Sequence, residues 1–161
     1  MATYFAAVVA RTSRGWVGRE LEMAGIEDLD ALADQMRDVG DGGTTLFFLE
    51  EDDEYLAIVR VDGDGDPRTF ISDDRAVASS PLAELVMQDV AVPEPAEDDD
   101  EEGIKPAPEA LGDAEVVADL GVPSATLLEL CAEEGYLPSD IMTAICEKAG
   151  CVDVLDEVRG T

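Results

Sequence analysis

The longest run of strand-forming residues lies between positions 44 and 62. It consists of two apolar segments, 44–49 and 55–61, separated by a short acidic break at 50–54. β-Branched and aromatic residues dominate both segments, and neither contains Gly or Pro. This pattern predicts a β-hairpin buried in the middle of a sheet. The turn-forming residues at 62–67 then lead into a third predicted strand, 68–72.

The chain before this hairpin predicts two more strands and one helix. Residues 4–11 are apolar on both alternating faces, which indicates a strand that is covered on each side. Residues 16–23 alternate and predict a half-exposed strand paired back on the first, with Gly18 marking a bulge. Asp28 precedes apolar residues at helical spacing, so we expect it to cap a helix over 29–39.

Two helical segments follow the third strand. Ser72 or Asp73 can cap a helix through 75–78, and Pro81 begins a segment over 82–88. The predicted order is β-β-α-β-β-β-α, and the short connections favour a largely antiparallel sheet with two helices on one face. We therefore expect residues 1–92 to form one α+β domain.

The composition changes after residue 92. Residues 93–112 hold eight acids, one base and several prolines, which predicts a disordered, extended acidic linker. Residues 113–161 predict a small all-α unit with helices over 114–120, 125–134 and 138–148, and a last turn or two at 152–158. Because so short a unit has a small core, we expect it to dock on the first domain or on a partner.

The charge is strongly negative, with 39 Asp and Glu against 10 Lys and Arg and a net charge of −29. Such a field repels nucleic-acid phosphates, so no direct binding of nucleic acid is expected unless the few arginines cluster. A basic protein partner is the natural counterpart. The alternative is that the charge only keeps the protein soluble and monomeric.

The three cysteines favour a reducing, cytoplasmic environment, because their number is odd and neither a C-x-x-C motif nor a signal peptide is present. Cys131 and Cys146 lie on apolar helix faces, which predicts buried structural thiols. Cys151 follows a helix-ending glycine and is expected to be the exposed one. No apolar run approaches the roughly 20 residues of a membrane helix.

Catalytic and cofactor motifs are absent from the sequence. Without histidine there is no Ser-His-Asp or Cys-His pairing and no histidine-containing zinc set. No P-loop or G-x-G-x-x-G occurs, and the glycines at 40–43 precede a predicted strand instead of a helix. The sequence therefore predicts no catalytic residue, no cofactor and no enzyme activity.

One acidic segment superficially resembles a calcium loop. Asp62, Asp64, Asp66 and Asp73 stand at EF-hand positions 1, 3, 5 and 12. Position 6, however, is Pro67 where the motif requires glycine, and the flanking segments are predicted strands. A solvated hairpin turn is the better interpretation, so we expect no metal site.

Several segments together resemble the actinobacterial family of tRNA adenosine deaminase-associated proteins. They are YFAAVVAR at 4–11 with Trp16 after it, EDLDAL at 27–32, YLAIVRVDG at 55–63 and PRTFISD at 67–73. The resemblance covers residues 1–92, and the acidic linker and helical tail are similar in style. It implies a gene beside that of the deaminase, the enzyme that makes inosine at the tRNA wobble position. The zinc deaminase signature, H-x-E with P-C-x-x-C, is absent from this chain.

The resemblance and the charge together favour a non-enzymatic cytoplasmic accessory protein that binds or regulates a tRNA-modifying deaminase. An alternative is an orphan domain, unrelated to tRNA, that binds a small ligand or another protein. A third hypothesis is an enzyme that uses carboxylates, which would require a cleft of converging acids with displaced pKa values. The sequence does not locate an interaction surface.

Overall fold

The computed structural model describes residues 4–40, 42–51, 54–63, 65–88, 110–132 and 137–159. Within these ranges the chain forms one six-stranded sheet, and every neighbouring pair of strands is antiparallel. The sheet order is β2-β1-β3-β4-β5-β6. The strands are β1 (Tyr4–Thr12), β2 (Gly15–Glu20), β3 (Thr44–Glu51), β4 (Tyr55–Asp62), β5 (Arg68–Ile71) and β6 (Leu111–Gly112). The predicted α+β fold with a largely antiparallel sheet is confirmed.

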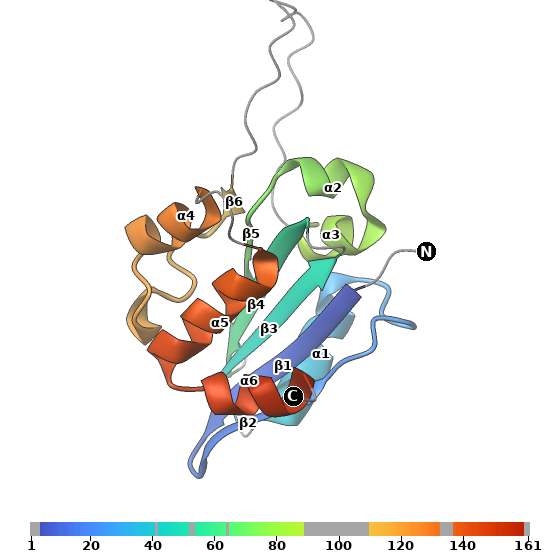
Figure 1. The fold of residues 1–161 in the computed structure, drawn as a ribbon. Helices are drawn as coiled ribbons and strands as arrows, with labels where there is room; N and C mark the ends of the chain where they lie inside the picture. The colour runs from blue at the N-terminus through green and yellow to red at the C-terminus, as the bar shows by residue number, and fades with distance from the viewer. Residues whose placement is uncertain are drawn as a thin grey trace, which may run out of the picture.

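Helices cover both faces of the sheet, which gives three layers (Figure 1). The first face carries α1 (Leu29–Val39), α2 (Arg75–Ser79) and α3 (Pro81–Val86). The second face carries the short 3-10 turn η2 (Ala118–Leu120), α5 (Pro138–Ala149) and α6 (Val152–Arg159), while α4 (Ser124–Ala132) packs against α5.

The central hairpin, β3 and β4, contributes to the core on both faces. Phe47 and Leu49 of β3 point into the first core with the apolar stripe of α1. Leu46 and Phe48 alternate with them and point into the second core, where they join Ile145 of α5. All four of these β3 side chains are fully buried. An apolar run without alternation is therefore the expected pattern for a strand that lies between two layers of helices.

The C-terminal helices dock on the sheet, a point that the sequence left open. Ile141 and Ile145 of α5 are buried in the second core, where α5 contacts β3 and β4. Leu155 of α6 is buried in the same core, and α6 contacts β1 and β2. The division into a domain at 1–92, a linker at 93–112 and a unit at 113–161 stays a prediction. Residues 89–109, most of that linker, lie outside the part of the chain that the structure describes.

The last residues of the predicted linker form a strand. Leu111 and Gly112 pair with Ile71 and Phe70 as β6, at the edge beside β5. Gly112 has a φ of +102°, and a Cβ there would lie 2.3 Å from the carbonyl oxygen of Thr69. Only glycine allows the chain to approach β5 so closely, and a two-residue strand has no periodicity that the sequence could reveal.

The bulge expected at Gly18 is absent. The register between β1 and β2 is continuous, with Val9 opposite Gly18 and Ala10 opposite Val17. A Cβ at Gly18 would lie 2.6 Å from Cγ1 of Val154 in α6. The glycine is needed because a helix passes directly over the strand, the other common reason for glycine within a strand.

The helix expected over 114–120 is reduced to successive tight turns and η2. In an α-helix the Val116 carbonyl would accept from the Leu120 N–H, but Leu120 donates to Val117 instead. The Val116 carbonyl accepts from Nη1 of Arg60 in β4 at 3.0 Å. A side chain from a distant strand thus takes the acceptor that the helix would have used.

Candidate protein-docking groove

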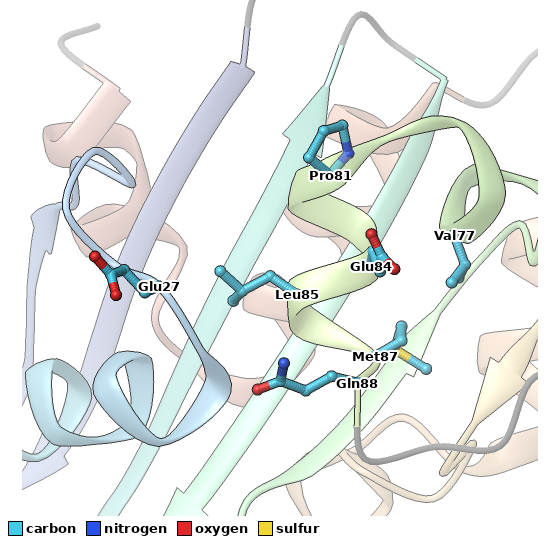
Figure 2. A pocket seen from close by; sticks show the side chains of 7 residues that line it. All are labelled: Glu27, Val77, Pro81, Glu84, Leu85, Met87 and Gln88. Carbon is cyan, nitrogen blue, oxygen red and sulfur yellow. The ribbon is translucent and has the colours of Figure 1, made fainter.

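An open groove of about 630 Å³ lies on the first face, between the loop before α1 and the helices α2 and α3. Figure 2 shows the side chains that line it. They are Glu27 from the loop, Val77 from α2, and Pro81, Glu84, Leu85, Met87 and Gln88 from α3 and its C-terminal end. These residues come from two segments of the chain that lie about 50 residues apart.

The groove combines apolar surface with two carboxylates. Leu85 points from α3 toward Glu27, and Glu84 lies on the side of α3 nearer Val77 (Figure 2). Both glutamates are exposed, whereas Val77 and Leu85 are half-buried and Met87 is buried. Among the described residues neither glutamate forms an ion pair. The groove therefore offers apolar contact together with two uncompensated negative charges.

The loop that carries Glu27 is held on the sheet by its backbone. The Leu21 N–H donates to the Ala6 carbonyl at 2.8 Å, and the Met23 N–H donates to the Tyr4 hydroxyl at 3.0 Å. The side chains of Leu21 and Met23 are buried in the first core. This wall of the groove is consequently a fixed part of the fold.

Gln88 joins the two walls. Its Oε1 accepts a hydrogen bond from the backbone N–H of Leu29 at 2.5 Å. Leu29 is the first residue of α1, where the N–H has no partner within the helix. The side chain of Gln88 thus satisfies a helix N-terminus and sets the distance between α1 and the end of α3.

The other end of α3 is anchored on the central hairpin. Ser80 caps the helix by accepting from the Ala83 N–H at 3.2 Å. The Ser80 hydroxyl also donates to Oε1 of Glu51 at 2.5 Å, and the Tyr55 hydroxyl donates to the same oxygen at 2.8 Å. Glu51 belongs to β3 and Tyr55 to β4, so these hydrogen bonds fix the N-terminal end of α3 on the sheet.

The comparison with protein families identifies the family. The model of the Rv3753c-like tRNA adenosine deaminase-associated proteins matches residues 4–152. This chain belongs to that family. It is also 26% identical over 157 residues to Protein Rv3753c of Mycobacterium tuberculosis (strain ATCC 25618 / H37Rv), an alignment that covers 96% of this chain and 86% of that protein. No solved structure matches the chain.

The match confirms the resemblance found in the sequence. It extends through β6, η2, α4 and α5 and ends at the first residue of α6, whereas the quoted segments lie within residues 1–92. The family description names association with a tRNA adenosine deaminase and not the deaminase itself. In the described part of the chain, no helix is both long and apolar enough to cross a membrane.

Two of the four carboxylates of the calcium-loop look-alike accept hydrogen bonds from arginines. Asp62 accepts from Nε of Arg60 at 3.1 Å, and Asp73 accepts from Nη2 of Arg75 at 3.0 Å. Asp66 lies in the turn, and Asp64 lies outside the described residues. No group of three or more potential metal ligands occurs among the residues with described positions.

The expectation that Cys151 is exposed was wrong. It is buried in the second core, at 1% exposure, because the chain turns at Gly150 and the Cys151 N–H donates to the Cys146 carbonyl at 2.9 Å. A hydrogen bond with Cys151, together with burial, raises the pKa of Cys146, and the same bond lowers the pKa of Cys151. Cys146 is buried as predicted, whereas Cys131, also expected to be buried, is only half-buried. Partial burial raises the pKa of Cys131 to about 11.

Sequence reasoning missed the groove. Leu82, Leu85 and Val86 recur at helical spacing, and this pattern is the one signal in the sequence of an apolar surface there. Glu27 and Glu84 gave no signal of a site in the sequence, because acidic residues are common throughout this chain. Their significance depends on the packing of α3 beside the start of α1, a contact that no local pattern encodes.

Proposed function

We propose that this protein is a non-enzymatic accessory protein of a tRNA adenosine deaminase and binds it as an acidic partner. A basic and apolar segment of the deaminase would lie in the groove between the loop before α1 and the helices α2 and α3. The groove supports this proposal through one observation: Glu27 and Glu84 lie beside apolar side chains and form no ion pair with any residue that the structure describes.

The charge of the whole chain favours such a partner. A net charge of −29 attracts a basic protein over long distances and increases the rate of encounter. A protein that binds tRNA needs basic surface for the phosphates. In this proposal the long-range field guides the encounter, and the groove provides the short-range contacts that define the orientation.

The alternatives have less support from the structure. A small-molecule site usually encloses most of its ligand, whereas this groove is open and its carboxylates are exposed. A carboxylate-using enzyme needs acids that converge in a cleft. The carboxyl groups whose pKa is lowered, Asp113 and Asp119, accept hydrogen bonds from Arg68 and Arg60 and do not line the groove.

The proposal is tested by titrating the full chain with the tRNA adenosine deaminase of the same cells in a calorimeter at low salt. The variant E27K/E84K should weaken binding by about tenfold or more, corresponding to about 1.4 kcal/mol. Its matched control is E129K/E147K, which makes the same charge change at exposed sites on α4 and α5. We expect the control to change affinity by less than about threefold.

Two results would contradict the proposal. If the wild-type chain gives no heat of binding and does not co-purify with the deaminase at low salt, the association itself is refuted. If both double variants weaken binding equally, only the net charge matters, and the groove is not the docking site.

A further inference from the structure

The first 19 residues of this acidic chain contain no Asp or Glu. They carry Arg11, Arg14 and Arg19, although the whole sequence has only 10 basic residues against 39 acidic ones. All three arginines lie on the hairpin formed by β1 and β2, and all three are exposed. Arg11 and Arg14 lie at the turn end of this hairpin, whereas Arg19 pairs with Val8, three register positions away and on the other face.

The remaining arginines are used within the protein. Five of the eight donate to carboxylate, carbonyl or hydroxyl oxygens: Arg37, Arg60, Arg68, Arg75 and Arg159. Within the described ranges, the side chains of Arg11, Arg14 and Arg19 donate to no oxygen and form no ion pair. The arginines that stabilise the fold are therefore a different set from Arg11, Arg14 and Arg19, whose guanidinium N–H groups all remain available.

The hairpin holds Arg11 and Arg14 on an ordered tip. The turn between β1 and β2 projects beyond the end of the sheet (Figure 1). Within it the Thr12 hydroxyl donates to the Gly15 carbonyl at 2.7 Å and accepts from the Arg14 N–H at 3.1 Å. Arg14 is therefore presented by a turn whose shape is fixed by hydrogen bonds.

An aromatic ring lies beside the arginines. Arg11 stands opposite Trp16 in the β1–β2 register, and its guanidinium carbon is 5.8 Å from the centre of the indole ring. Trp16 is half-buried and packs in part against the second core. Guanidinium groups bind phosphates through paired N–H donors, and indole rings stack on nucleobases. A carboxylate-rich peptide would use the arginines but would gain nothing from the ring.

We propose that the β1–β2 hairpin tip, residues 11–16, contacts the phosphate backbone of RNA, namely the tRNA held by the deaminase. The choice of tRNA rests on the proposed function above, since this RNA would be present in the same complex. The −29 field opposes RNA elsewhere on the molecule, so contact is restricted to the tip. Arg11 and Arg14 lie together at this tip, and a local group of arginines is the condition under which a direct contact with nucleic acid was expected.

The test measures fluorescence anisotropy of a labelled transcript of the tRNA substrate with the deaminase and this protein together. R14E should weaken tRNA binding by the complex by about threefold to tenfold and reduce the slope of log affinity against log salt by about one. The matched control is K148E, the same charge change at an exposed lysine on α5. K148E should leave both quantities within about twofold of wild type.

A second measurement separates this inference from the proposed function. Trp16 is the one tryptophan of the chain, so its fluorescence reports on the tip in the protein alone. At low salt the same tRNA should quench Trp16 in the wild type and less in R14E, whether or not the deaminase binds. A calorimetric titration of R14E with the deaminase should match that of the wild type.

Three results would overturn the inference. Equal losses for R14E and K148E would mean that only net charge matters. Quenching of Trp16 by poly-glutamate as strong as that by tRNA would assign the tip to an acidic protein instead. Absence of any Trp16 response to tRNA at low salt would exclude RNA from the tip. A failure of deaminase binding alone would refute the proposed function and leave the Trp16 titration to decide this inference.

Discussion

Gly18 shows how a single position allows a helix to pack closely on the sheet. Gly18 faces α6 from β2, and a side chain there would meet Val154 Cγ1 at 2.6 Å and the Val8 carbonyl oxygen at 3.1 Å. Contacts between a real Cβ and other heavy atoms below 3.0 Å are essentially never seen. The absence of a side chain at this position therefore allows α6 to pack on the edge of the sheet.

We expect Gly18→Ala to lower the free energy of unfolding by about 1–3 kcal/mol, because a methyl group is forced into a filled space. Urea denaturation measures this. In a Val154→Ala background the same substitution should cost clearly less, since the clashing methyl group is gone. A cost that is unchanged in that background would show that the clash with α6 is not the cause.

At the scale of elements, Arg60 joins strand β4 to the segment around η2. Its guanidinium is 5% exposed and contacts Asp119 at 2.5 and 2.9 Å, Asp62 at 3.1 Å and the Val116 carbonyl at 3.0 Å. The hydrogen bond from Arg60 lowers the pKa of Asp119 below its usual range. This arginine replaces a helical hydrogen bond and so determines that the segment does not become a helix.

The Arg60–Asp119 pair predicts a pH-dependent contribution to stability. A lowered folded-state pKa favours the folded protein above the ordinary Asp value of about 3.9, and the benefit is lost as the pH falls through the lowered value. The difference in unfolding free energy between wild type and Asp119→Asn should be constant above about pH 5 and shrink toward pH 2. Because Asp119 is 62% exposed, we expect at most about 1 kcal/mol.

Chemical denaturation between pH 2 and 7 provides this comparison. Asp153→Asn, at an exposed site on α6, is the control for loss of one negative charge. A difference between wild type and Asp119→Asn that grows as the pH falls would contradict the assigned role of the pair.

For the whole molecule, the sheet is the shared wall of two cores. The first core is closed by α1 to α3 and the second by the C-terminal helices, so the segments before and after residues 89–109 complete one structure. Each buried Leu, Ile or Phe contributes about 1.5–3 kcal/mol relative to exposure, against a total stability of about 5–15 kcal/mol. Removal of one layer of helices would therefore cost more free energy than the total stability of the folded protein.

Truncation after residue 92 should accordingly prevent cooperative folding. Phe48, Ile58 and Phe70 lose their cover on the second face, so we expect strong binding of a hydrophobic dye and a broad thermal transition. The full chain under the same conditions is the control. A sharp, cooperative unfolding transition in the truncated chain would instead establish residues 1–92 as an independent domain.

Most secondary structure was predictable because it depends on neighbours in the sequence. The helix over 29–39 begins and ends where the Asp28 cap and the apolar stripe predict, and Asp28 accepts from the Ala31 N–H at 2.8 Å. The strands of the central hairpin follow their β-branched and aromatic runs. The failures were β6, the segment before η2 and the supposed bulge, where contacts with distant residues override the local pattern.

By itself the sequence determined the strands β1 to β5, most helices, the acidic charge and the family resemblance, because each depends on residue type and spacing. The tertiary structure decided the rest. It placed the C-terminal helices on the second face, buried Cys151, created the groove between Glu27 and Glu84, and separated the structural arginines from those on the hairpin tip. These features depend on contacts between residues far apart in the chain, and such contacts have no periodic signature.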